Sequence, residues 1–180
     1  FYGMCQFKVG ATHLACVGVL HMVDQTRDVQ LLISRDGIRW KRTNKGQPFL
    51  AYRGDGYWDG YMQAICSPPI EVGDELWFYH GGSACTHDMW RSAKEGISHP
   101  ELDDPSKVEF SLGLARLRKD GFASLDTNPY REGIVVTRCL VSLGNRLVIN
   151  VRCRPGGSVR VEIADKYDEP IGPCSLERCD

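Results

Sequence analysis

Short apolar runs separated by turn-forming residues dominate this sequence, and no long stretch keeps the period of an amphipathic helix. Runs of this kind, bounded by glycine, proline, asparagine or aspartate, are typical of β-strands. We predict strands at 14–23, 29–34, 75–80 and 110–118. The run 75–80 is apolar on both faces, which indicates a strand enclosed between two layers. The pattern as a whole predicts an all-β fold.

Two Asp-Gly pairs are placed where strands should reverse direction. Asp36-Gly37 follows the run 29–34 and predicts a two-residue hairpin turn, in which Asp36 tolerates the left-handed backbone and Trp40 packs beneath. Asp120-Gly121 follows the run 110–118 in the same way. We interpret Asp36-Gly37 as a folding device without a chemical role.

The predicted strands recur in two sets. Sets of roughly four strands cover about 1–45 and about 58–126, and four-stranded repeats of this length suit the blades of a β-propeller. Two blades do not close a ring. We therefore predict that the propeller is incomplete, with about two blades, and that missing blades of the same chain are its partners.

The pattern of apolar and polar residues changes near residue 129. The segments 134–141, 146–154 and 158–164 alternate apolar and polar residues, as expected of an antiparallel sheet with one buried and one solvated face. We predict propeller blades over 1–128 and the start of a C-terminal β-sandwich, also incomplete, over 129–180.

Composition excludes several classes of partner. The chain has 42% hydrophobic and 25% charged residues and a formal net charge of −1, which fits a globular protein and gives no attraction to nucleic acid. No apolar run approaches the roughly 20 residues of a membrane-spanning helix. We therefore expect no nucleic-acid partner and no membrane span.

The eight cysteines form no C-x-x-C pair, which argues against a zinc ribbon or a thioredoxin-like site. Cys139 and Cys153 lie on neighbouring predicted strands, but the register about the turn between them would point the two thiols to opposite faces. We do not expect that disulfide. Cys174 and Cys179 are the pair to test first, and most of the eight are predicted to be buried free thiols.

Several motifs together resemble a known group. Residues 34–40 are similar to the S-x-D-G-x-x-W hairpin of glycosidase-like propellers, and Tyr-Trp-Asp-Gly at 57–60, Pro-Pro-Ile at 68–70 and Tyr-His-Gly at 79–81 resemble the recurrent blade pattern. The group is the five-bladed β-propeller glycoside hydrolases, in the broad clan of invertases, arabinanases and mannoside phosphorylases. The resemblance implies a partial five-bladed propeller followed by part of a β-sandwich, and it favours an extracytoplasmic or secreted protein. Members of the clan use carboxylates contributed by several blades.

Asp59 is the candidate catalytic residue. Hydrolysis of a glycosidic bond needs two carboxyl groups across the scissile bond. Asp59 follows Tyr57 and Trp58, whose rings could stack on a sugar, and Trp90 is a second candidate stacking residue. The alternative is that Asp59 only caps a turn at the start of a strand.

The remaining candidates are substrate-binding residues. His80 precedes two glycines that would let a ligand approach the backbone. The resemblance to mannoside phosphorylases implies that Tyr79 and His80 lie in the active site, where the histidine contacts phosphate; the alternative is a structural histidine. Arg53 and Asp55 could line the rim of the pocket and bind hydroxyl groups. No metal-ligand spacing and no cofactor motif is present, so neither a metal nor an organic cofactor is predicted.

These residues lead to two hypotheses. The first is a fragment of a carbohydrate-active, glycoside hydrolase-like propeller protein that acts on glycosidic bonds. The second is a non-catalytic glycan-binding or structural propeller, because fold does not determine chemistry. A carbohydrate is the expected ligand in the first case and in the glycan-binding form of the second.

Overall fold

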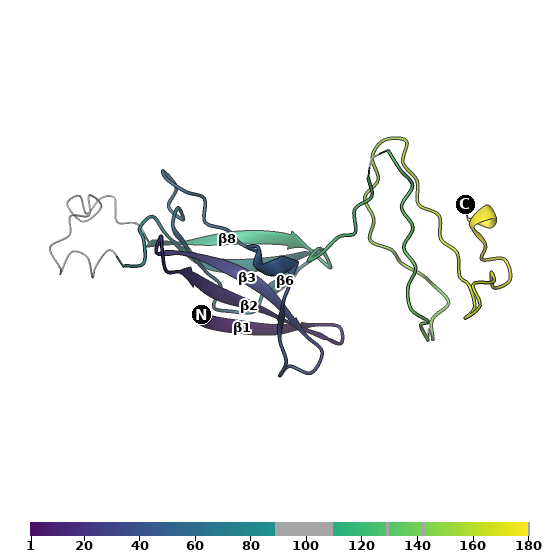
Figure 1. Ribbon diagram of the computed structural model, residues 1–180, viewed down its shortest axis with the longest axis horizontal. Helices are drawn as coiled ribbons and strands as arrows, with labels where there is room; N and C mark the ends of the chain where they lie inside the picture. The colour runs from purple at the N-terminus through teal and green to yellow at the C-terminus, as the bar shows by residue number, and fades with distance from the viewer. Residues whose placement is uncertain (89–109, 129, 142, 180) are drawn as a thin grey trace. The chain divides into compact units, whose positions relative to one another are not determined.

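The computed structural model describes residues 1–88, 110–128, 130–141 and 143–179 (Figure 1). It contains eight β-strands in one mixed sheet. The described residues contain no α-helix, and the two helical segments are short 3-10 turns at Asn44–Gly46 and Leu176–Arg178. The predicted all-β character is confirmed. The described part of the chain has no helical segment with the length and apolar character of a transmembrane span.

The first four strands form an antiparallel meander. They are β1 (Tyr2–Val9), β2 (Thr12–His21), β3 (Thr26–Ser34) and β4 (Lys41–Arg42), and each pairs with the next along the chain. β2 and β3 contain the predicted runs 14–23 and 29–34 in whole or in large part. Hydrogen bonds along the β1–β2 and β2–β3 ladders hold the three long strands in a continuous register, apart from one irregularity in β1.

The second four strands are arranged around β7. They are β5 (Met62–Ala64), β6 (Ile70–Val72), β7 (Glu75–Ser83) and β8 (Phe110–Arg118). β5 and β6 pair with the two ends of β7, and β8 pairs with β7 over its whole length. A single parallel bridge, Arg27 to Met62, joins β3 to β5 and makes one sheet of the two sets.

The core lies between the two sets of strands. Phe78 of β7 contacts Phe7 of β1, with ring centroids 6.0 Å apart, although these strands are not neighbours in the sheet. Phe49 and Phe122 complete the aromatic cluster, at 5.5 and 6.4 Å from Phe78. The sheet therefore curls so that β1–β3 and β7 face each other across a buried apolar layer, whose members include Leu14, Cys16, Val29, Leu31, Ile65 and Leu76.

Only one face of β7 is buried. Leu76, Phe78 and His80 point into the core, whereas Trp77 is half-buried and Tyr79 is 47% exposed. The prediction that 75–80 is enclosed on both faces is therefore wrong for the described residues. Tryptophan and tyrosine are apolar enough to mimic a buried pattern in sequence, yet their rings tolerate partial exposure.

The turn after β3 is longer than predicted. The connection runs from Arg35 to Trp40, and only Gly37 has a left-handed backbone, with φ of 73°. Asp36 acts through its side chain: Oδ1 accepts hydrogen bonds from the amides of Arg39 and Ile38 at 2.7 and 2.9 Å, which lower the pKa of this carboxyl group. Trp40 Nε1 donates to the Gly37 carbonyl at 3.2 Å. The two-residue hairpin is therefore wrong, because the Asp36 side chain stabilises a wider loop.

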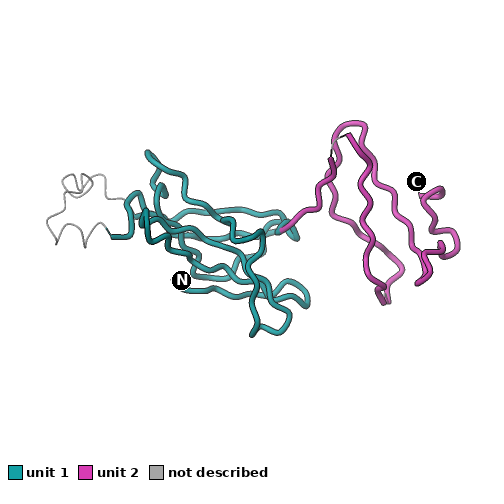
Figure 2. Tube along the Cα trace, viewed as in Figure 1, with its two compact units in different colours: residues 1–122 teal, residues 123–180 magenta. Residues whose placement is uncertain are grey.

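Residues 123–180 form a second compact unit (Figure 2). The segments 134–141, 146–154 and 158–164, predicted as strands, form no ladder, and the only β-bridge among the described residues of this unit joins Ala164 and Pro170. The apolar side chains of the expected buried face are exposed, among them Val135, Leu147, Val159 and Ile163. Alternation alone does not make a sheet when the unit provides no second layer to cover the apolar face.

None of the eight cysteines, all of which lie in the described residues, forms a disulfide, and Cys174 and Cys179 are not bridged. Cys179 Sγ instead accepts a hydrogen bond from the Val161 amide at 3.2 Å. Only Cys5, Cys16 and Cys85 are buried, so the prediction of mostly buried thiols is wrong. The three buried thiols all belong to the unit that has a core. Burial raises the pKa of Cys16 to about 12, which makes this thiol a poor nucleophile at neutral pH.

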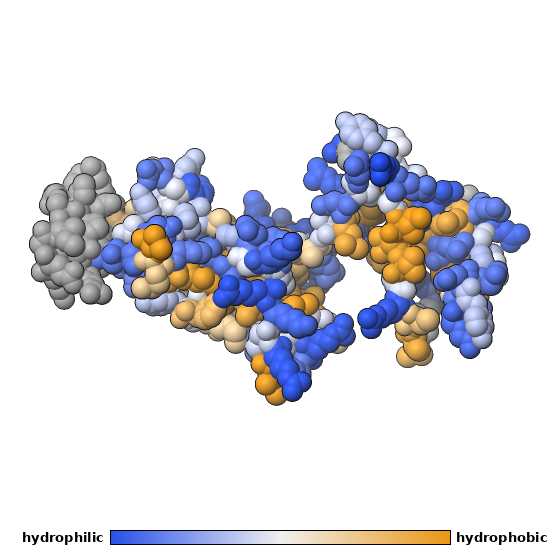
Figure 3. Space-filling view, in the orientation of Figure 1, coloured by the Kyte–Doolittle hydropathy of each residue, from blue (hydrophilic) through white to orange (hydrophobic). Residues whose placement is uncertain are grey.

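The outer face of β8 predicts self-association. Phe110, Leu112 and Leu114 alternate along this strand and are 58%, 85% and 41% exposed, and Figure 3 shows apolar side chains at the surface of the molecule. Contiguous exposed apolar residues on a strand favour association. We expect oligomers or aggregates at micromolar concentration, measured by size-exclusion chromatography with light scattering, and a larger monomer fraction for Leu112→Lys. Leu125→Lys, a change at an exposed leucine outside β8, is the control. A wild-type monomer that unfolds in one cooperative transition would contradict this expectation.

Candidate functional site

A closed loop before β5 positions the candidate residues. The Gly54 amide donates to the Gly60 carbonyl at 2.9 Å and the Arg53 amide donates to the Asp59 carbonyl at 3.2 Å, so the two ends of the loop meet. Gly60 has no room for a side chain, because a Cβ there would collide with the Gly54 carbonyl. The Tyr61 amide then donates to the Ser83 carbonyl of β7 at 3.0 Å. These contacts hold Trp58 and Asp59 against the inner face of the sheet.

Asp59 is the centre of a chain of polar side chains. Its Oδ1 accepts a hydrogen bond from Arg53 Nε at 2.5 Å, and its Oδ2 accepts one from Gln63 Nε2 at 2.7 Å. Gln63 Oε1 lies 2.7 Å from Nδ1 of His80. Asp59, Gln63 and His80 are buried, while the Arg53 side chain is 46% exposed. A buried carboxylate with both oxygens paired is the arrangement that makes burial of a charge tolerable.

Trp58 covers this chain of side chains from one side. Its ring stacks on the His80 ring, with centroids 5.5 Å apart and planes 26° apart. Two glycines on neighbouring strands make this possible. A Cβ on Gly113 of β8 would lie 2.6 Å from both His80 Nε2 and Trp58, and one on Gly82 of β7 would collide with Trp58 and with the Asp59 Cβ. The absence of two side chains therefore creates the space in which the stack lies.

Burial lowers the pKa of His80 below its ordinary value. The Arg53 guanidinium acts in the same direction, while the Asp59 carboxylate and the Gly81 backbone oppose them. His80 is therefore neutral at pH 7.

The structure brings together four of the seven candidates: Arg53, Trp58, Asp59 and His80. Asp55 is exposed and accepts a hydrogen bond from the Tyr61 hydroxyl, outside the chain of side chains. Tyr79 lies on the opposite face of β7 from His80. Trp90 lies outside the described residues.

Gln63 is the residue that sequence reasoning missed. It is fully buried and is the only side chain among the described residues that contacts both Asp59 and His80 through hydrogen bonds. Gln63 and Ile65 are two positions apart on the segment after the Trp-Asp pair, and both are buried. A polar residue at a core-facing position of a strand is the signal that could have identified it.

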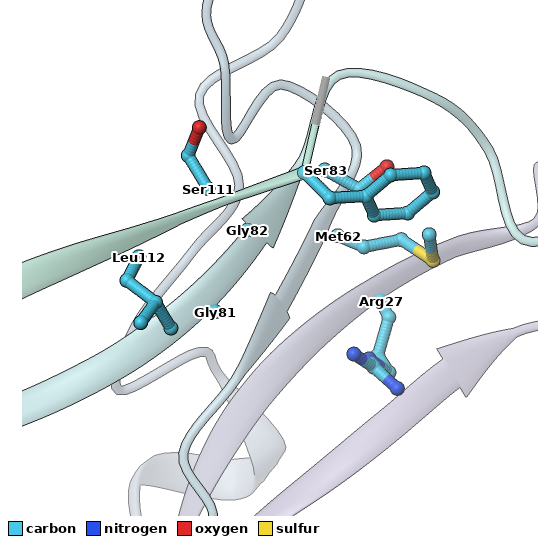
Figure 4. Close-up of a pocket in the computed structure, with 8 residues that line it drawn as sticks. Arg27, Met62, Gly81, Gly82, Ser83, Ser111 and Leu112 are labelled. Carbon is cyan, nitrogen blue, oxygen red and sulfur yellow. The ribbon is translucent and has the colours of Figure 1, made fainter. Parts of the chain in front are cut away.

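Neither of two hollows in the described part of the chain is lined by Asp59 or His80. One, of about 290 Å³, lies over Gly81 and Gly82 between Arg27, Met62 and Leu112 (Figure 4). The other, of about 520 Å³, lies beside Trp40 and Arg42 on the first meander. Gly82 and Arg27 belong to the first hollow and also contact the Asp59 cluster, Arg27 through a hydrogen bond from Nε to the Gln63 carbonyl at 3.0 Å.

Asp59 is the one carboxylate among the described residues that joins this cluster. The described residues include no group of three or more histidine, cysteine, aspartate or glutamate side chains that could hold a metal ion. The cluster can therefore offer a ligand a planar cation, a carboxylate and an aromatic face.

No protein-family model, curated protein or solved structure matches this chain.

Proposed function

We propose that this protein is carbohydrate-active, as part of a glycoside hydrolase-like propeller, and that the Asp59 cluster binds a sugar. The observation that carries the proposal is the juxtaposition of Trp58, Asp59 and Arg53 on one closed loop. Sugars present hydroxyl groups that both donate and accept hydrogen bonds, next to apolar C–H faces. A carboxylate, a guanidinium and an indole face match those three features.

The exposed edge of the cluster supports the same ligand class. The Arg53 guanidinium lies over the Tyr57 ring at 4.3 Å, and Tyr57 is half exposed. The stacked pair presents a flat surface with hydrogen-bond donors at its edge. A sugar ring would contact this surface first and reach Asp59 beyond it.

The arrangement of strands supports the propeller part of the proposal. Each set of strands has four members, and the two sets pack face to face over an apolar layer, as neighbouring blades do. We propose β1–β4 and β5–β8 as two blades within 1–128, and 129–180 as part of a sandwich domain.

Glycan binding without hydrolysis is the second candidate, and the geometry of Asp59 favours it over catalysis. Both carboxylate oxygens of Asp59 are already engaged, by Arg53 and Gln63. Glycoside hydrolysis also needs a second carboxyl group about 5–9.5 Å away, and the described residues of the cluster contain no other. In the catalytic form of the proposal the second group comes from outside the cluster.

The proposal is tested by titrating the 180-residue chain with a panel of neutral mono- and oligosaccharides. We expect at least one sugar to change the fluorescence of Trp58, identified by loss of the change in Trp58→Phe. Arg53→Met should weaken binding about tenfold or more, because a hydrogen bond to a charged group contributes about 1.5–3 kcal/mol. Arg118→Met, at an exposed arginine of β8, should leave binding unchanged. A panel in which no sugar binds would overturn the proposal.

Hydrolysis is measured separately, with aryl glycosides and a reducing-sugar assay on the chain together with its flanking sequence. In the catalytic form, Asp59→Asn should abolish turnover and spare sugar binding. If the wild type binds a sugar and turns over none, the protein is a glycan-binding module.

A further inference from the structure

The orientation of the Gln63 side-chain amide is determined by Asp59. Gln63 Nε2 faces two oxygens of Asp59, Oδ2 at 2.7 Å and the backbone carbonyl at 3.4 Å. Exchanging the amide nitrogen and oxygen would place Oε1 against both acceptors. The nitrogen therefore points to Asp59, and Oε1, which only accepts hydrogen bonds, points to His80.

We propose that Asp59, acting through Gln63, fixes His80 in the tautomer that carries its proton on Nδ1. Nδ1 lies 2.7 Å from Gln63 Oε1 and can make this hydrogen bond only as a donor. In a neutral imidazole the other nitrogen, Nε2, is then an acceptor. Gln63 is thus a positioning residue, because it transmits the charge of Asp59 to a ring that Asp59 does not touch.

The surroundings of His80 agree with a neutral ring. The charged groups that act on it are Asp59 and Arg53, which oppose each other, and burial favours the neutral form. Trp58 stacks on the ring, and Gly113 of β8 lies beside Nε2. The ring makes a hydrogen bond to Gln63 through Nδ1, and a hydrogen bond with the Gly81 backbone also acts on it.

The tautomer of His80 does not depend on the proposed function. Its consequence for the choice of ligand does rest on that function. A ligand group that meets Nε2 has to donate a hydrogen bond, so the site favours the hydroxyl of a neutral sugar over an anion without an O–H group, such as acetate. Acetate should therefore leave the His80 ring nitrogens unshifted at neutral pH.

The tautomer is measured by long-range ¹H–¹⁵N correlation of the imidazole nitrogens in the ¹⁵N-labelled chain. The chain has five histidines, and the His80 signals are those missing from His80→Gln. We expect at least about a tenfold excess of the Nδ1–H form, because one buried hydrogen bond separates the two forms. The signals should stay those of the neutral ring at about pH 6.5, where an unperturbed histidine is about half protonated. A predominant Nε2–H form or a protonated ring at that pH would overturn the proposal without bearing on sugar binding.

Asp59→Asn should reverse the tautomer. Arg53 Nε only donates, so in this variant the oxygen of the new side-chain amide faces Arg53 and its nitrogen faces Gln63. Gln63 then turns its oxygen to the asparagine and its nitrogen to His80, where Nδ1 becomes the acceptor. We expect the Nε2–H form to predominate. A folded variant that keeps the wild-type tautomer would contradict the proposal that Asp59 acts on His80 through Gln63.

Two further variants separate this effect from a general change in packing. Gln63→Glu places a second carboxyl group against Asp59 Oδ2, so the two groups share a proton. The acid that donates to Asp59 still presents an acceptor oxygen to Nδ1, so this variant should retain the Nδ1–H form. Asp74→Asn, at an exposed position before β7, is the matched control and should leave the tautomer unchanged.

Discussion

Replacing Phe78 with alanine should destabilise the β-sheet unit by about 3–5 kcal/mol, the usual cost of truncating a buried phenylalanine. Phe78 is only 1% exposed, and it contacts rings from three other segments, at Phe7, Phe49 and Phe122. No single neighbour can fill the space that the ring leaves, because the three rings belong to different segments. We expect the midpoint of urea unfolding to fall with little change in slope.

The unfolding transition is followed by far-ultraviolet circular dichroism, with Leu112→Lys as the background if the wild type associates. Tyr130→Ala, at a side chain that is 93% exposed, is the control and should change stability by no more than about 0.5 kcal/mol. A cost below about 1 kcal/mol for Phe78→Ala would mean that the two sets of strands do not share one core.

The strands could be predicted where their own sequence carries the signal. β8 has the predicted bounds, and β2, β3 and β7 contain or overlap their predicted runs, because β-branched and aromatic residues between turn signals give a local pattern. The pairing of β3 with β5 could not be predicted in this way. The two strands share a single β-bridge, between Arg27 and Met62, and these residues are far apart in the sequence.

The second unit shows the limit of alternation as evidence. The segments 134–141 and 158–164 have a clear period of two, yet their apolar residues are exposed and no ladder forms among the described residues. A period of two predicts that a segment will have one apolar face if it forms a strand. Whether another layer covers that face depends on contacts with residues outside the segment.

Most residues of the candidate site could be predicted from their own sequence surroundings, but the residue that connects Asp59 to His80 could not. The sequence has residue types that can bind or react with a ligand near glycines, at Trp58, Asp59 and His80. Arg53 lies in the same loop as the first two. Gln63 is an ordinary polar residue in sequence, and its importance depends on the distance between β7 and the Asp59 loop. The resemblance of the Tyr-His-Gly run implies that Tyr79 lies in the site together with His80, but neighbours on a strand point to opposite faces.

The two glycines that face Trp58 connect the fold to the site. Gly113 has no positive φ and lies within β8, so its backbone would accept any residue. Strand propensity by itself would favour valine at this position. Glycine is therefore required here by the side chains opposite it, which makes Gly113→Val a direct test of the Trp58–His80 stack.

Gly113→Val should destabilise the protein by about 1–3 kcal/mol, the usual cost of forcing extra atoms into a packed site. A Cβ at this position would lie 2.6 Å from His80 Nε2 and from Trp58, so at least one of these rings has to move. We expect red-shifted tryptophan fluorescence, since Trp58 is displaced toward solvent. Leu112→Val, the neighbouring change on the outer face of β8, should have little effect on either measurement.

A double-mutant cycle with Trp58→Ala assigns the cost to the stack. Removing the indole gives the valine room, so the loss caused by Gly113→Val should be smaller in the Trp58→Ala background than in the wild type, with a coupling of about 0.5–3 kcal/mol. Additive losses would mean that valine acts elsewhere, and a stable Gly113→Val protein with unchanged fluorescence would mean that Trp58 does not lie against β8.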